Sequence, residues 1–222
     1  MDKQIDSSGE AGVEQAQPLG VRAAAKARTR QRLIEAGRRL FMERGYEGAT
    51  VRDIAGAADL STGAVFASFA DKTELFNAVL ETDSLAQIAA MIAALPPSGP
   101  VSERLIATLS AAYAYQLAQI GLLRAGFAVS WSQGLTGELG DRPIRSSAME
   151  MIRDLLAAGV PRGEIKAGCD LDILTETIWD CFIGNYRLAL FNGQGVEQLT
   201  DRLRRQVQLI MAGAGEVGEA RT

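Results

Sequence analysis

Hydrophobic residues recur along this chain mostly three and four positions apart, which is the spacing of amphipathic helices. No segment keeps the alternation of apolar and polar residues that a half-buried strand shows. The pattern predicts helices over about 22–44, 72–95, 101–120, 122–131, 143–158, 170–191 and 196–211. Clusters of glycine and proline, as at 96–100 and 159–163, separate several of these helices. The fold is therefore predicted to be all-α.

The stretch 50–72, TVRDIAGAADLSTGAVFASFADK, predicts two short helices joined by a tight turn. Thr50 followed by Asp53 is typical of a capping box, and Ser61 is a good N-cap for the second helix. Val65 and Phe69 lie four positions apart, so one face of the second helix can pack on the first. The other face is slim enough to enter a DNA major groove, since it carries Thr62, Gly63, Ala64, Phe66, Ala67 and Ser68.

An ordinary helical hairpin, whose two helices only pack together, is the alternative for this stretch. The charge distribution favours DNA: the whole chain has a net charge of −4, but residues 21–72 carry ten Lys and Arg against six Asp and Glu, or +4. Five of these basic residues open the first helix, at Arg22, Lys26, Arg28, Arg30 and Arg32. A solvated charged face and contact with phosphates explain them equally well.

The amino-acid composition excludes several classes of function. The chain has 222 residues, 47% hydrophobic and 23% charged, which is typical of a globular protein. It has no histidine, which excludes His-based catalysis and His metal sites, and we expect neither a metal nor a cofactor. Cys169 and Cys181 form no disulfide framework, and packing explains them better than redox sensing does. The opening MDKQIDSSGE is no secretory signal and no apolar run approaches membrane-spanning length, so we expect a cytoplasmic protein without membrane contact.

The region from about 30 to 80 resembles the tetracycline-repressor (TetR) family of bacterial transcription regulators. The resemblance rests on LFMERGYEGATVRDIA, on Ser-x-Gly from Ser61, on aromatic-x-x-Phe from Phe66, and on DKTEL from Asp71. It implies a three-helix DNA-binding head with a helix-turn-helix at 21–71 and a larger helical body for effector binding and dimerisation at 72–213. A disordered arm is expected at 1–20 and a flexible tail at 214–222. The implied function is that of a regulator, a repressor in most members, that leaves a palindromic operator when a small molecule binds.

The resemblance also implies roles for single residues. Thr50 and Arg52 would lie near a phosphate and a groove edge, and Lys72 would pair with a phosphate. The predicted DNA-binding set is Thr50, Arg52, Ser61, Thr62, Gly63, Ala64, Phe66, Ala67, Ser68 and Lys72.

Three positions depart from the family's usual residues. Phe66 stands where Tyr is usual, Ser68 where a larger polar or aromatic residue is common, and Asp59 where Gly is common. The second helix therefore has few hydrogen-bonding side chains. Arg52, Thr62 and Ser68 are predicted to carry much of the base readout, with thymine-methyl contacts and DNA shape supplying the rest.

The body offers candidates for an effector site and a dimer interface. Aromatic and Met side chains could line an apolar cavity for a small, apolar or aromatic effector, although each is also a good core residue: Tyr113, Phe127, Trp131, Met149, Trp179 and Phe182. By resemblance the last two helices form a homodimer interface, with the candidates Gly184, Leu199, Leu203, Val207 and Ile210. A two-fold dimer requires half-sites about 34–36 Å apart, or multiples of that.

A helical small-molecule carrier or enzyme, whose helix-turn-helix is only scaffold, is the rival function. The sequence shows no nucleophile–base pair and no Gly-rich phosphate loop, so we expect no enzyme. A carrier would have the same kind of apolar body. Only the basic head distinguishes the two, because a carrier would show no salt-dependent affinity for duplex DNA.

Overall fold

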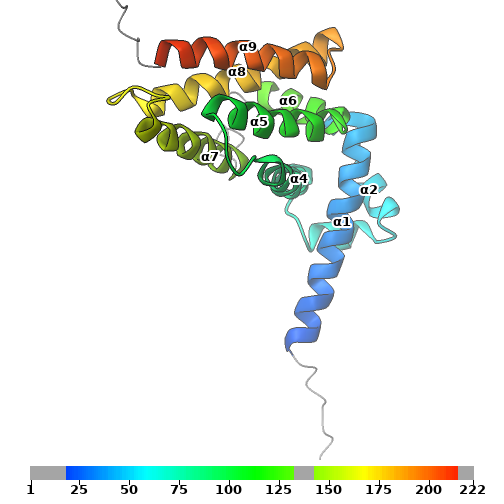
Figure 1. Ribbon diagram of the computed structural model, residues 1–222. Coiled ribbons are helices and arrows are strands. Elements are labelled where there is room, and N and C mark those ends of the chain that lie inside the picture. Colours follow the sequence, from blue (N-terminus) through cyan, green and yellow to red (C-terminus); the bar gives the residue numbers. More distant parts are fainter. Residues whose placement is uncertain (1–18, 133–142, 215–222) are drawn as a thin grey trace, which may run out of the picture.

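The computed structural model describes residues 19–132 and 143–214, and every regular element in these ranges is a helix (Figure 1). This confirms the all-α prediction. Residues 1–18 and 215–222, which hold most of the predicted arm and tail, lie outside the described ranges. The helices are α1 (Leu19–Gly48), α2 (Val51–Ala57), α3 (Thr62–Phe66), α4 (Lys72–Ala94), α5 (Val101–Leu117), α6 (Ile120–Ser132), α7 (Pro143–Gly159), a 3₁₀ turn (Val160–Arg162), α8 (Leu171–Asn192) and α9 (Val196–Ala214).

One hydrophobic core joins α1, α2 and α3 to the first half of α4. Its fully buried members include Leu33, Phe41, Ile54, Val65, Phe69, Leu75 and Phe76. Gly45 takes a positive φ, of 71°, and Tyr46 packs back on Phe41 with ring centroids 5.9 Å apart. Gly45 has non-helical dihedral angles, so α1 consists of a long helix up to Arg44, as the predicted range 22–44 requires, and a short helical turn that reaches Gly48.

The same core includes one side of α6, through Leu122, Ala125 and Val129. Helix α6 crosses α1 at Gly121, where an added Cβ atom would overlap the carbonyl oxygen of Met42. Only glycine permits so close a crossing of two backbones. The contact ties the middle of the chain to the helix-turn-helix region.

A second core fills the body formed by α5, α7, α8, α9 and the end of α4. At its centre five aromatic side chains contact one another: Tyr113, Phe127, Trp179, Phe182 and Tyr186. In Figure 1, α8 and α9 lie along one side of the body, and α1 points away from that side.

Several predicted helix ends are confirmed by their hydrogen bonds. The carboxylate of Asp71 accepts from the Glu74 amide at 2.8 Å, and Asp170 caps α8 in the same way. Gly193 ends α8 in the left-handed region, with φ 67°. The predicted flexible tail at 214–222 is wrong at its first residue, because Ala214 is buried and its carbonyl accepts a backbone hydrogen bond from Lys166 at 2.8 Å.

Within the described ranges no single helix is long and apolar enough to cross a bilayer; α5 and α6 reach that measure only jointly, and they are bent by 94°. No group of three acidic or Cys side chains in those ranges could hold a metal ion. Both cysteines are free and half-buried. Burial, followed by the nearby carboxylate of Asp180, raises the pKa of the Cys181 thiol, which lowers its reactivity at neutral pH.

Candidate nucleic-acid interface

Helix α2 begins with the predicted capping box. Thr50 Oγ1 accepts from the Asp53 amide at 3.1 Å, and the Asp53 carboxylate accepts from the Thr50 amide at 3.3 Å and from its hydroxyl at 2.6 Å. Arg44 of α1 lies 3.5 Å from the same carboxylate. The two hydrogen bonds from Thr50, more than the charge of Arg44, lower the pKa of Asp53 below its usual 3.8. The ionised carboxylate therefore fixes the start of α2.

This cap predicts a pH-dependent stability difference. A carboxyl group whose folded-state pKa is lowered contributes stability that is present above its unfolded pKa and lost as the pH falls through its folded pKa. We expect Asp53→Ala to be less stable than wild type at pH 7, and the difference to shrink as the pH falls from about 4 through the lowered pKa of Asp53. Urea unfolding at pH 7 and at about pH 3 measures it, with Asp53→Asn as a control that keeps an acceptor without titrating. An equal difference at both pH values would contradict the role of the ionised carboxylate.

The turn between α2 and α3 depends on Asp59 and on two arginines of α1. Asp59, which stands where Gly is common in the family, has φ 52° and is the only non-glycine with a positive φ among the described residues. Arg32 donates to the carbonyl of Ala58 at 2.6 Å, and Arg39 to that of Ala57 at 3.3 Å. These bonds satisfy the free carbonyls at the end of α2. Arg32 therefore stabilises the turn. The sequence did not predict this role, because Arg32 is one of several basic residues in the same part of the first helix.

Helix α3 presents the slim outer face that was predicted. Ser61 caps it by accepting from the Ala64 amide at 3.2 Å, and Val65 and Phe69 are buried beneath it. On the outside Thr62, Gly63, Phe66 and Ala67 are exposed, and the Phe66 side chain is 58% accessible. A large apolar ring exposed among small residues, on a helix whose inner face is fixed, is available for a partner.

The other residues predicted to contact DNA differ in whether their side chains already have partners within the protein. Arg52 is exposed on α2. The Ser68 hydroxyl donates to the Ala64 carbonyl at 3.0 Å, which leaves it able only to accept a further bond. The Lys72 amine donates to the Tyr46 carbonyl at 3.0 Å and lies 4.2 Å from the Tyr46 ring centre, so it is positioned at the end of α1. Their contacts with DNA stay predictions.

The predicted effector residues come together in the body, mostly as packed core. Tyr113 and Phe182 are fully buried with ring centroids 4.8 Å apart, and the Tyr113 hydroxyl donates to the Phe182 carbonyl at 3.0 Å. Burial raises the pKa of Tyr113 far above neutral pH, so its hydroxyl stays protonated. Trp179 and Phe127 join this cluster, and Met149 packs against the same core. The side chain of Trp131 lies outside the described residues.

The prediction that Leu199, Leu203 and Val207 form the dimer interface is wrong. All three are completely buried in the core of a single protomer, where a partner cannot reach them. Ile210 is half-buried against the same core. The error has a physical cause: an apolar stripe at bundle spacing packs equally well inside a chain and between chains.

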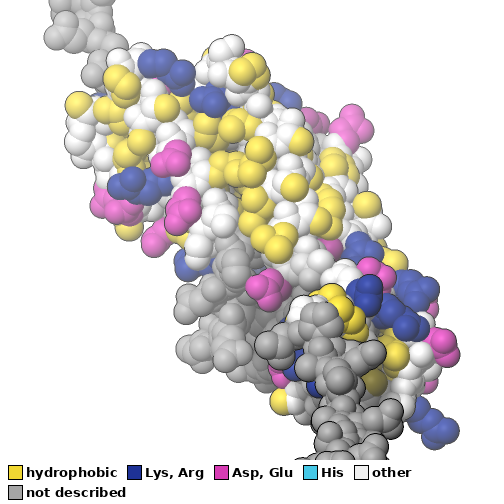
Figure 2. Space-filling view, turned by 90° about the horizontal axis from the view of Figure 1, so that it is seen from below, with side chains coloured by type: hydrophobic (Ala, Val, Ile, Leu, Met, Phe, Trp, Pro, Cys, Tyr) yellow, Lys and Arg dark blue, Asp and Glu magenta, His cyan; other side chains and the backbone are white. Residues whose placement is uncertain are grey.

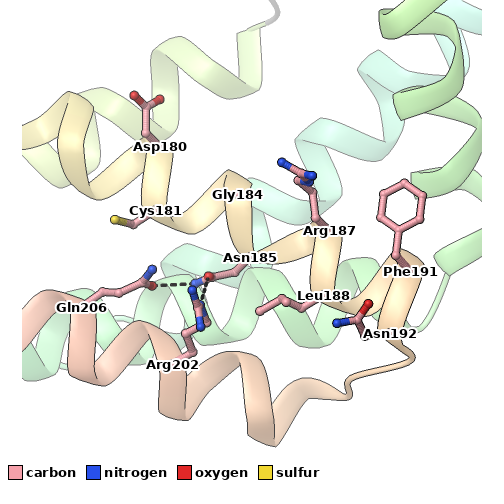
Figure 3. A pocket seen from close by; sticks show the side chains of 10 residues that line it. All are labelled: Asp180, Cys181, Gly184, Asn185, Arg187, Leu188, Phe191, Asn192, Arg202 and Gln206. Atoms are coloured by element: carbon pink, nitrogen blue, oxygen red, sulfur yellow. Dashed lines mark hydrogen bonds between the residues drawn. The ribbon is translucent and has the colours of Figure 1, made fainter.

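Gly184 is exposed, as the dimer prediction requires. Nothing would lie within 4 Å of a Cβ atom at this position. It lines a pocket of about 600 Å³ between the outer faces of α8 and α9 (Figure 3). Asn185 joins the two helices there, because it donates to Gln206 at 2.8 Å and accepts from Arg202 at 3.0 Å.

A buried polar network between head and body was not predicted. Asp83 of α4 is 4% exposed, and its carboxylate accepts from the Tyr115 hydroxyl at 3.1 Å and from the Gln116 amide at 3.2 Å. Arg38 of α1 lies 3.8 Å from Asp83 and also donates to Gln119. A buried carboxylate needs such partners. The sequence hints at this network only by placing Asp83 on the apolar face of its helix. The same position is also compatible with an exposed carboxylate, so burial could not be predicted.

Comparisons with known proteins agree with this geometry. The family model described as "Bacterial regulatory proteins, tetR family" matches residues 33–79. The chain is 30% identical over 191 residues to the HTH-type transcriptional repressor AcnR of Corynebacterium efficiens, covering 81% of this chain and 93% of that protein. It is 31% identical over 185 residues to AcnR of Corynebacterium glutamicum, with 79% and 88% covered. Its fold is similar to that of the regulator FadR from Bacillus subtilis in complex with stearoyl-CoA, with a TM-score of 0.67, 18% identity, and 82% and 98% covered.

Proposed function

Because this chain belongs to the TetR family of bacterial regulatory proteins, it is a DNA-binding transcriptional regulator, and we propose that it is a dimeric repressor released from its operator by a small molecule. Repression is the activity that both AcnR relatives are named for. The observation that carries the proposal is the exposed face of α3, fixed from beneath by Val65 and Phe69. We assign no reaction to the chain.

Base recognition would combine few hydrogen bonds with apolar contacts. Arg52 and Thr62 are exposed and can reach base edges, whereas Ser68 can only accept. The exposed ring of Phe66 and the methyl group of Ala67 suit thymine methyl groups. We therefore propose an operator with thymines at the positions under α3, and a share of specificity from DNA shape.

The dimer would use the outer faces of α8 and α9. Gly184 allows a partner helix to approach closely, and Phe191, which is 79% exposed, offers apolar area beside it. The Asn185–Arg202–Gln206 bonds keep this surface rigid. A two-fold axis through this surface would place the two α3 helices in successive major grooves of a palindromic operator.

Selection of bound duplexes from a random pool, followed by salt titration of the winners, tests the proposed function. We expect a palindrome whose affinity falls steeply as salt rises. A carrier that keeps the helix-turn-helix only as scaffold would enrich no sequence above non-specific binding. That result would remove the repressor proposal and favour the carrier.

The effector would bind against α5. The hydroxyl oxygen of Thr108, which is 2% exposed, is shielded from solvent and has no hydrogen-bond partner among the described residues. A buried hydroxyl without a partner destabilises a protein by about 1–3 kcal/mol. A bound molecule with an acceptor or donor would relieve this penalty, and the surrounding core would suit its apolar part.

Thr108→Val is expected to raise the free energy of unfolding of the free protein by about 1 kcal/mol, because it removes the unpartnered hydroxyl at nearly constant volume. Thr175→Val is the matched control: Thr175 is equally buried, but its hydroxyl donates to the Leu171 carbonyl at 2.7 Å. The control should lose stability by about 1 kcal/mol. Urea unfolding measures the free energy of unfolding of both variants. An equal loss of stability in Thr108→Val and Thr175→Val would contradict the claim that the Thr108 hydroxyl has no partner.

Release would pass through the junction of head and body. Helix α4 runs through both cores, and Asp83 at its middle holds Arg38 of α1 together with Tyr115 and Gln116 of α5. An effector that shifts α5 would move these partners and change the spacing of the two heads. The distance between the two Thr62 residues, measured in dimers with and without effector, should differ. Equal distances would refute this route.

A further inference from the structure

The first three turns of α1 extend beyond the rest of the molecule (Figure 1). Every side chain described from Gly20 to Arg28 is exposed, so this segment gains almost nothing from tertiary packing. Four of its residues are alanines, which favour a helix without needing a partner. It has no apolar stripe that would dock on a protein or insert into a membrane surface.

The segment carries positive charge without acidic neighbours. No Asp or Glu occurs from Gly20 to Ile34, and the described residues show no ion pair for Arg22, Lys26 or Arg28. The unbalanced charge of this segment fits a polyanion. Seen from below, Lys and Arg side chains gather at the lower right of the molecule, with some Asp and Glu side chains among them (Figure 2).

Most of the basic residues at the start of α1 lie on one face of the helix. At 100° per residue, Arg22, Lys26 and Arg30 lie within about 80° of one another on the helix, and Arg28 lies on the opposite side. The same stripe continues into the head core as Leu33, Gly37 and Leu40. The core-facing stripe of α1 thus turns basic where the helix leaves the core.

This basic stripe points to the side of the head where α3 lies. The guanidinium carbon of Arg30 sits 4.3 Å from the ring centre of Phe69, three residues after the end of α3. From Arg30 the stripe runs about 12 Å along α1 to Arg22. A duplex read by α3 presents one phosphate per about 1.7 Å of its axis, so phosphates are within reach of a stripe that starts beside it.

We propose that Arg22 and Lys26 bind DNA phosphates outside the base pairs read by α3, which makes the start of α1 a second, sequence-independent contact with the operator. The contact rests on the proposed function, since it needs a duplex held at α3. It adds affinity and salt dependence to all sequences equally, because phosphates carry no base identity.

The test compares the full-length wild type with Lys26→Ala, Arg28→Ala and the double variant Arg22→Ala/Lys26→Ala. Binding to the selected operator and to a scrambled duplex of equal length is titrated with salt. Each lost phosphate contact should lower the slope of log K against log salt by about 0.9 and the affinity at 0.1 M salt by roughly 8-fold. Because a dimer carries each substitution twice, Lys26→Ala should lose two contacts and the double variant four, on both duplexes alike. Arg28→Ala is the matched control, with the same charge removed from the opposite face, and should keep the wild-type slope.

Two results would overturn the contact. One is a wild-type slope in the double variant, and the other is an equal loss in Lys26→Ala and Arg28→Ala, which would reflect net charge and not a face. Circular dichroism checks that alanine leaves the helix content unchanged. Failure of the proposed function looks different, because the wild type itself would then not distinguish operator from scrambled duplex.

Discussion

Gly63→Glu is expected to lower operator affinity by about 100-fold or more, equivalent to about 3 kcal/mol, while the protein stays as stable as wild type. Gly63 lies on the exposed face of α3, and a Cβ atom there would meet only Ser61 Oγ, at an ordinary 3.6 Å. The protein therefore has room for the new side chain. A duplex in contact with α3 has none, and its phosphates repel the carboxylate.

Gly213→Glu is the control for this change. Gly213 lies on α9, where nothing would lie within 4 Å of a Cβ atom, and the variant adds the same charge far along the chain from α3. Fluorescence anisotropy with labelled operator measures both proteins, and thermal unfolding confirms that each is folded. Operator binding by Gly63→Glu within threefold of Gly213→Glu would show that α3 is not the DNA-reading helix.

Gly121→Ala is expected to destabilise the protein by about 3 kcal/mol or more, because the added methyl group would overlap the Met42 carbonyl oxygen. Backbone cannot move aside as a flexible side chain can, so α1 and α6 must separate. Their separation would open the core that Leu122, Ala125 and Val129 share with the head. Operator binding should fall with stability, because α2 and α3 rest on the same core.

The same helix supplies the control. At Gly126 an added Cβ atom would meet only Leu80 Cδ2, at 3.8 Å, which is an ordinary van der Waals contact. Gly126→Ala should therefore stabilise the protein by up to about 1 kcal/mol through helix propensity. Urea unfolding of both variants tests the pair. A Gly121→Ala protein as stable as Gly126→Ala would contradict the close crossing of α1 and α6.

Local features of this fold could be predicted from the sequence because short-range chemistry decides them. The capping box of Thr50 and Asp53, the N-caps Ser61 and Asp71, and the left-handed Gly193 each depend on residues a few positions apart. The exposed face of α3 follows from the same local logic, since Val65 and Phe69 fix which side is buried.

Contacts between distant segments could not be predicted in this way. The apolar stripe of α9 shows a buried face but not whether α5 and α8 or a second chain covers it. Asp83 acquires its role only when Arg38, Tyr115 and Gln116 converge on it from two other helices. Arg32 and Arg39 likewise resemble solvated charges until α2 ends beside them.

Substitution of uracil for single thymines of the selected operator tests most directly whether α3 reads the major groove. Uracil lacks only the C5 methyl group, which thymine presents in the major groove. We predict loss of affinity at thymines in two clusters, symmetric about the operator centre and 10–10.5 base pairs apart or a multiple of that. Unchanged affinity at every thymine, or a single unpaired cluster, would contradict a dimer that places two α3 helices in successive major grooves.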